Sequence, residues 1–239
     1  LTGIGWESFK DCTSLTSIDI PDSVTTISGR AFYNCTKLSE VGYPAGWTTV
    51  PDYYRNSTTH YSYNSGHEDY RSPFEGCTSL KKIEIDEGVT AIPNYAFRYQ
   101  TSIEEVVLPE SLTTIKVYAF EGCTSLKTVD FKNGIKSIGN FAFLDCSSLE
   151  NIDIPSSLEY IGNSAFRDCT SLTSVFIPKT LKTIGVAVFS GCTGIVSAEF
   201  EAGITVIPEE ILTHCSSLSS VTVPNSVTEI ESDAFSYCK

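Results

Sequence analysis

The sequence has no methionine, little positive charge and no long apolar run. Lys and Arg total 16 against 29 Asp and Glu, a net charge of −13, so the chain lacks the basic surface that binding to nucleic acid or anionic membranes requires. Uninterrupted apolar stretches are only a few residues long, which predicts no membrane insertion. Because a natural chain begins with Met, we expect these 239 residues to be part of a longer protein with further turns or flanking domains.

Cysteine, by contrast, is abundant and regularly spaced. Its nine copies stand at positions 12, 35, 77, 123, 146, 169, 192, 215 and 238. Six of the eight intervals are 23 residues, one is 46 and one is 42. Gln100 takes the cysteine position inside the interval of 46, and 42 equals 23 plus 19. One 23-residue register with one insertion therefore fits the whole chain, which is the pattern of a solenoid.

Two further columns repeat in the same register, within the pattern C-T-S-L-x-x-I-x-I-P-x-S-V-T-x-I-G-x-x-A-F-x-x. The aromatic column consists of Phe9, Phe32, Phe74, Phe97, Phe120, Phe143, Phe166, Phe189, Leu212 and Phe235. The aliphatic column before the Gly position consists of Ile4, Ile27, Val50, Ile92, Ile115, Ile138, Ile161, Ile184, Ile207 and Ile230. A single turn cannot bury such residues alone, so the turns must stack.

Each part of the period predicts a local structure. L-x-x-I-x-I alternates apolar and polar residues and indicates a short strand with one buried face, which Pro or a later Gly then ends. V-T-x-I-G predicts a second extended piece, and x-x-A-F-x-x a short helical or irregular turn. The sequence therefore predicts an α/β-type repeat solenoid of about ten coils, forming a single domain over 1–239 and roughly 45–50 Å long.

The cysteine column has three interpretations: disulfides, a metal site, or buried reduced thiols. Equivalent side chains in stacked turns have Cβ atoms near the roughly 4.8 Å turn spacing, whereas a disulfide needs them about 3.8 Å apart. The count is odd, and no C-x-x-C spacing suggests zinc. We expect buried, reduced cysteines that pack as small hydrophobic residues.

The repeats "CTSLTSIDIPDSVTTISGRAF" and "CSSLENIDIPSSLEYIGNSAFRDC" resemble the BspA-like leucine-rich repeats, also called the Treponema pallidum type. The resemblance covers essentially the whole chain apart from residues 52–71. It implies a curved leucine-rich-repeat array with a parallel β-sheet on the concave side and the short turns opposite. It also implies secreted or cell-surface proteins of host-associated bacteria and some parasitic protists, several of them proposed adhesins. The family shares no catalytic residues, so none is transferred here.

One candidate binding surface is the concave sheet face. The polar position inside I-x-I is occupied by Asp19, Gly42, Glu84, Val107, Asp130, Asp153, Phe176, Glu199 and Thr222. This acidic stripe suggests a groove for a basic partner, with Phe176 as a contact anchor. The alternative is an ordinary solvated strand face, and the sequence leaves both open.

The other candidate surface is a loop insertion at residues 52–71, within the coil that begins at Cys35. It holds five of the twelve tyrosines and two of the three histidines, and no Val, Ile or Leu. Such a composition is typical of a recognition loop, in which Tyr contacts a protein or stacks on a sugar. Its candidate binding residues are Tyr53, Tyr54, His60, Tyr61, Tyr63, His67, Tyr70 and Arg71. The alternative is a flap that packs on its own solenoid.

Metal binding and catalysis have weaker sequence support. His60, His67, Glu68 and Asp69 match no standard metal-ligand spacing, so we expect no metal site and no cofactor. No G-x-S-x-G motif or other convergent catalytic set occurs, so we do not expect an enzyme. The Asn34 and Asn56 tripeptides fit the N-glycosylation pattern, which matters only in a eukaryotic source.

These observations predict a non-catalytic recognition or adhesion module, secreted or on a cell surface. We expect it to be a monomer that binds a host or microbial surface protein or glycan. The alternative is a structural spacer array that presents other domains and has no ligand of its own. The uniform coils from 101 to 238 favour that alternative.

Overall fold

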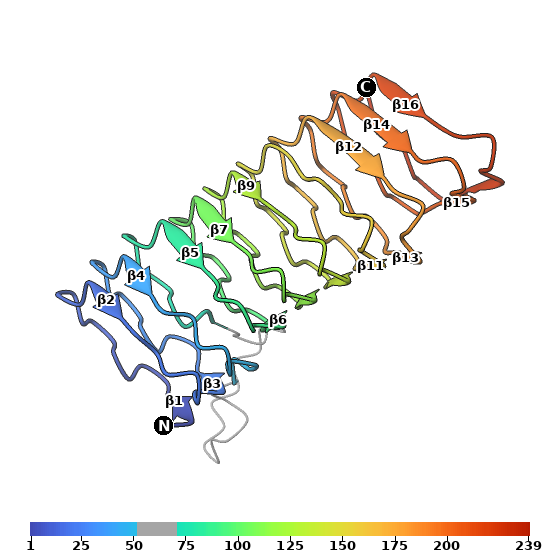
Figure 1. The fold of residues 1–239 in the computed structure, drawn as a ribbon. Helices are drawn as coiled ribbons and strands as arrows, with labels where there is room; N and C mark the ends of the chain where they lie inside the picture. The colour runs from blue at the N-terminus through green and yellow to red at the C-terminus, as the bar shows by residue number, and fades with distance from the viewer. Residues whose placement is uncertain (52–70) are drawn as a thin grey trace, which may run out of the picture.

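The computed structural model describes residues 1–51 and 71–239, which wind into a parallel β-solenoid (Figure 1). The solenoid has about nine turns of about 23 residues, and its two termini lie at opposite ends. The expected ten coils overstate the number of complete turns, because the first and the last position of the aromatic column belong to partial turns. The curvature expected from the resemblance stays a prediction.

The L-x-x-I-x-I segments form one line of parallel strands, called here the first ladder, along one long side of the solenoid (Figure 1). Its strands are β2 (Ser17–Ile18), β4 (Glu40–Val41), β5 (Lys82–Glu84), β7 (Glu105–Val107), β9 (Thr128–Val129), β12 (Ser174–Ile177), β14 (Ser197–Phe200) and β16 (Ser220–Thr222). Hydrogen bonds divide the first ladder into three sheets, β2-β4, β5-β7-β9 and β12-β14-β16.

The V-T-x-I-G segments form a second ladder of their own, on another side of the solenoid. Its strands are β1 (Gly3–Ile4), β3 (Thr26–Ile27), β6 (Ala91–Ile92), β8 (Thr114–Ile115), β10 (Ser137–Ile138), β11 (Tyr160–Ile161), β13 (Thr183–Ile184), β15 (Val206–Ile207) and β17 (Glu229–Ile230). The second ladder is continuous from β6 to β13, and this range includes the interruption of the first ladder between β9 and β12. The sequence predicted the extended segment, but not that it would pair into a sheet.

Strand pairing follows the 23-residue period without slippage. Ile4 pairs with Ile27, Lys82 with Glu105, and Ser174 with Ser197, each pair 23 positions apart. A shift of one residue would turn every buried side chain outward, so the inward columns hold the register.

The Ala-Phe turns are irregular, and the helical alternative is wrong: the residues that the structure describes form no helix. Most of these turns contain two residues in the left-handed region, four positions apart, such as Arg30 and Asn34 with φ of 55° and 58°. A right-handed helix cannot continue through such residues. Backbone groups bond to the next turn instead, as when the Phe9 amide donates to the Ala31 carbonyl at 2.7 Å.

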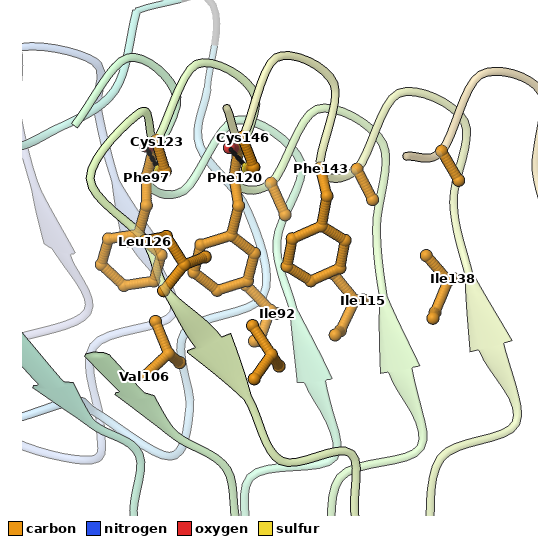
Figure 2. Close-up of a cluster of buried hydrophobic side chains, with 14 of the residues drawn as sticks. Ile92, Phe97, Val106, Ile115, Phe120, Cys123, Leu126, Ile138, Phe143 and Cys146 are labelled. Carbon is orange, nitrogen blue, oxygen red and sulfur yellow. Dashed lines mark hydrogen bonds between the residues drawn. The ribbon is translucent and has the colours of Figure 1, made fainter. Parts of the chain in front are cut away.

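The core is a stack of phenyl rings along the solenoid axis, part of which is shown in Figure 2. Successive rings from Phe9 to Phe189 lie 4.9–5.8 Å apart, centroid to centroid, with planes within 16° of parallel. Ile92, Ile115 and Ile138 of the second ladder lie beneath the rings. Each turn thus buries the rings of its neighbours, as the repeat predicted.

All nine cysteines are free in the structure. Those from Cys35 to Cys215 are buried as expected, whereas Cys12 is exposed and Cys238 is half-buried. From Cys35 onward, each thiol donates to the carbonyl of an aromatic-column residue of the preceding turn, at 3.0–3.3 Å. The separation is 26 positions, as from Cys123 to Phe97, except for Cys77 and Phe32, which the insertion sets 45 apart. Burial raises the pKa of the Cys146 thiol, and that of Cys77 to about 12. The column therefore serves packing and turn closure.

With no helix among the described residues, there is also no segment in them with the length and apolarity of a helical membrane span.

Candidate functional site

The outward side of the first ladder, called here the first-ladder face, carries the predicted stripe. Asp19, Glu84, Asp130, Asp153, Phe176, Glu199 and Thr222 are exposed, and Gly42 and Val107 are half-buried. The exposed fraction of Phe176 is 44 %, beside the paired Glu199 of the next strand. The structure therefore brings the stripe into one continuous row, one residue per turn.

Lysines neutralise much of the middle of this face. Lys82 lies 3.5 Å from Glu84 and 3.6 Å from Glu105, and Lys132 pairs with Asp130 at 2.5 Å. In the part of the chain that the structure describes, Asp153 and Glu199 have no ion-pair partner. The charge is consequently uneven, with uncompensated carboxylates at particular turns.

The first ladder is broken at two places, and each break has a hollow beside it. Between β4 and β5, which do not pair, lies a hollow of about 520 Å³. We call it the first hollow; it is lined by Ser39, Glu40, Val41, Gly42, Tyr43, Lys82, Glu84 and Asp86. After β9 the next turn contributes only the bridge between Thr128 and Asn151. The second hollow, of about 370 Å³, lies there and is lined by Glu105, Val106, Val107, Leu108, Thr128, Val129, Asp130, Lys132, Asn151 and Asp153.

Large rings lie beneath the strand ends of the turns that precede both breaks. At the last inward position of I-x-I, where Ile177 stands in β12, the two turns before the breaks carry Tyr43 and Phe131. The Phe131 ring contacts its own turn and the next one, with edge contacts of 5.7 Å to Phe143 and 6.3 Å to Phe166. Tyr43 likewise lies 6.4 Å from Phe97. A ring at this position does not by itself break the ladder. Phe200 stands there in β14 and makes the same edge contact with Phe235 at 6.4 Å, and β14 still pairs with β16.

The sequence analysis did not predict the two hollows or their residues Glu40, Asp86 and Asn151. An aromatic residue at the last inward position of I-x-I precedes both breaks, but Phe200 stands at the same position where the ladder is continuous. No residue type at this position therefore separates broken turns from paired ones.

The insertion begins and ends at one place in the repeat. Pro51 matches Pro93 and Arg71 matches Asn94 of the following turn, so 52–70 are the 19 additional residues. Arg71 lies directly over Gly29, where an added Cβ would come within 2.7 Å of the Arg71 carbonyl oxygen. The predicted binding residues Tyr53, Tyr54, His60, Tyr61, Tyr63, His67 and Tyr70 lie outside the described residues.

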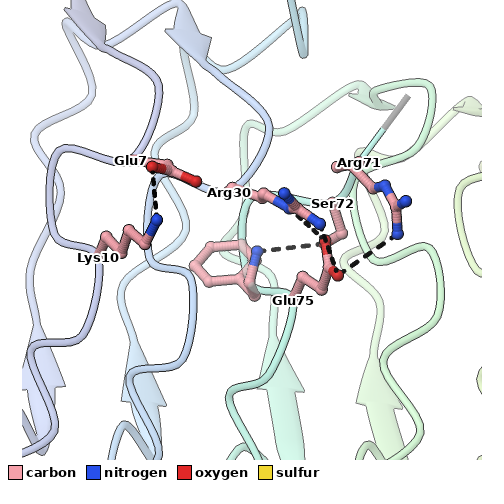
Figure 3. Close-up of polar contacts among 7 residues, drawn as sticks. Glu7, Lys10, Arg30, Arg71, Ser72 and Glu75 are labelled. Carbon is pink, nitrogen blue, oxygen red and sulfur yellow. Dashed lines mark hydrogen bonds and ion pairs between the residues drawn. The ribbon is translucent and has the colours of Figure 1, made fainter. Parts of the chain in front are cut away.

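A cluster of charged residues holds the position where the chain re-enters the repeat (Figure 3). Glu75 accepts from Arg30 Nε at 2.9 Å and from Arg71 Nη1 at 3.4 Å. Ser72 takes the repeat position of Arg30 but does not share its left-handed backbone, because a proline follows Ser72 and restricts its conformation. The Ser72 hydroxyl donates to the Ala96 carbonyl at 2.9 Å. Arg71 is therefore part of the scaffold side of this junction.

Residues 1–51 and 71–239 contain no group of three potential metal ligands. His60 and His67 are outside these ranges. His214 is exposed and stacks on Tyr237 at 4.5 Å between ring centroids.

Comparison with known proteins agrees with the fold. The profile of the BspA type leucine-rich repeat region, built of six copies, matches residues 1–97, 67–194 and 136–239. A leucine-rich repeat protein from Bacteroides ovatus is similar over 100% of this chain and 68% of its own, with 29% identity and a TM-score of 0.59. The T. pallidum leucine-rich repeat protein matches 62% of this chain and 72% of its own, with 30% identity and a TM-score of 0.59.

A leucine-rich repeat protein from Eubacterium ventriosum has the same fold at 22% identity, covering 99% of this chain and 80% of its own, with a TM-score of 0.52. No curated protein matches the chain.

Proposed function

Because the chain belongs to the BspA-type leucine-rich repeat family, we propose that it is a non-catalytic recognition module, secreted or held on a cell surface, that binds a protein or a glycan. Proteins of this kind are generally non-enzymatic repeat scaffolds, and their fold alone does not determine a ligand. The ligand class has to be argued from the surface that this chain presents.

The observation that carries the proposal is that the turns differ in their outward residues and agree in their buried ones. The inward columns keep Phe, Ile and Cys from turn to turn, as packing requires. The outward column of the first-ladder face changes from Asp19 to Gly42, Glu84, Val107 and Phe176. A surface that varies over an invariant core is what a repeat scaffold offers for recognition.

An array of host glycoproteins and glycans tests this function. Two forms are applied: the full chain, and a deletion of 52–70 that joins Pro51 to Arg71 as Pro93 joins Asn94. We expect saturable binding of at least one array member by the full chain. Loss of binding in the deletion form assigns the site to the insertion, and retention assigns it to the first-ladder face. Absence of binding to every member would favour the spacer array.

A further inference from the structure

The two hollows of the first-ladder face share a charge pattern. The first hollow has three carboxylates, Glu40, Glu84 and Asp86, and one cation, Lys82. Lys82 is shared between Glu84 and Glu105, at 3.5 Å and 3.6 Å. Across the described ranges, neither Glu40 nor Asp86 has an ion-pair partner. The first hollow therefore has more negative than positive charge in its lining.

The second hollow repeats this arrangement. Its carboxylates are Glu105, Asp130 and Asp153, and its one cation, Lys132, pairs with Asp130. Asp153 is exposed and has no partner among the residues described. Val107 adds an apolar wall. A long side chain with an apolar stem and a cationic end matches such a lining.

The open strand edges add hydrogen-bond acceptors. In the described structure no strand pairing joins β4 to β5, and only the Thr128–Asn151 bridge joins β9 to the next turn, so backbone carbonyls beside both hollows lack full ladder pairing. Lys and Arg side chains carry only hydrogen-bond donors, so one such side chain can bond to a carboxylate and to a backbone carbonyl of the same hollow.

We propose that the first-ladder face binds an extended basic polypeptide segment, with one Lys or Arg side chain entering each hollow. This inference rests on the proposed function and names the partner class and the surface. The net charge of −13 favours approach of such a segment over that of an anionic ligand.

Geometry sets the spacing within the partner. Two to three turns separate the hollows, which at about 4.8 Å per turn is roughly 10–14 Å. An extended chain advances about 3.3 Å per residue and alternates its side chains between two faces, so the two basic side chains lie four residues apart on the same face. The partner segment lies along the solenoid axis, across the strands.

Fluorescence anisotropy with short peptides tests the inference on the full chain. The first probe is a labelled Gly/Ser peptide with two Lys four residues apart; the second has the two Lys adjacent, and the third has two Glu in place of the spaced Lys. We expect the first peptide to bind more tightly than the second, and the third not to bind. Raising the salt from about 20 mM to about 200 mM weakens binding, since the Debye length falls below about 10 Å.

Matched variants separate the hollows from the overall charge. Glu40→Gln with Asp86→Asn removes two charges from the first hollow, and Glu209→Gln with Glu229→Gln removes two from the second-ladder side. We expect the hollow variant to weaken binding about threefold to tenfold and the control by less than about twofold. Asp153→Asn tests the second hollow, and circular dichroism melting verifies that each variant is folded.

Equal weakening by the hollow and control variants would overturn the inference, because binding would then follow net charge alone. Loss of peptide binding on deletion of 52–70 would also overturn it. Absence of peptide binding alongside a positive glycoprotein or glycan array would refute this inference and leave the proposed function standing. Absence of both would refute the proposed function itself.

Discussion

The segments β5–β9 and β12–β16 of the first ladder have the same strand register, but they differ in the outward side chains that they carry. The β5–β9 segment carries cross-strand ion pairs, such as Lys81 with Glu104 at 3.4 Å and Lys82 with Glu105 at 3.6 Å. At the positions of Lys82 and Glu105, β12–β16 carries Ser174, Ser197 and Ser220, and at those of Lys81 and Glu104 it has Thr173 and Val196. Strand pairing is at least as extensive in this fully described segment, which has no ion pair between its strands, with four residue pairs between β12 and β14.

The comparison indicates that the charges are not required for folding. Exposed ion pairs contribute only about 0–1 kcal/mol each, so serine in their place costs little. What the two segments share is the stack of rings and thiols beneath them. The surface of each turn is thus free to differ for binding, and the core is not.

The largest effect is expected from a substitution in the ring stack, which both segments share. Phe143→Ala, midway along the ring stack, should lower the free energy of unfolding by about 3–5 kcal/mol, because it leaves a cavity between Phe120 and Phe166. Urea denaturation followed by circular dichroism measures it. The matched control is Phe176→Ala on the surface of β12, expected to change stability by less than about 0.5 kcal/mol. Equal losses in the two variants would show that the stack does not dominate stability.

A second shared feature, the thiol column, predicts loss of stability at alkaline pH. Burial raises the pKa of Cys77 from 9.0 to about 12, whereas an unfolded chain ionises its thiols near pH 9. The raised pKa contributes stability in full below about pH 8, and the contribution is lost progressively as the pH rises towards 12. Urea midpoints measured between pH 7 and 11 test this, with Cys77→Val reducing the slope. A midpoint independent of pH would contradict the buried column.

The smallest effect is expected from the charged surface. Lys82→Ala removes two exposed ion pairs and should change the free energy of unfolding by less than about 0.5 kcal/mol. It should instead tighten binding of the spaced-Lys peptide about twofold, since the first hollow loses its only cation. Denaturation and anisotropy on the same preparation distinguish the two effects, and Ser197→Ala serves as the control in β12–β16.

Much of this architecture could be predicted because it depends on periodicity. The 23-residue columns required that Phe32 and Phe74 stack and that Cys123 stay reduced, since equivalent positions in stacked turns face the same way. The stripe from Asp19 to Glu199 was likewise placed on one face by strand alternation. The short turn was open between helix and irregular structure because left-handed residues such as Tyr95 or Asp145 have no distinctive sequence signature.

By itself, the sequence determined the repeat, its register, the buried columns and the identity of the outward residues, because each depends on spacing along the chain. Only the tertiary structure decided that V-T-x-I-G pairs into a second ladder and that the first ladder breaks after Tyr43 and Phe131. It also decided which carboxylates are left without a lysine. These outcomes depend on side-chain volume and distance between turns, which a periodic pattern of hydrophobic residues does not encode.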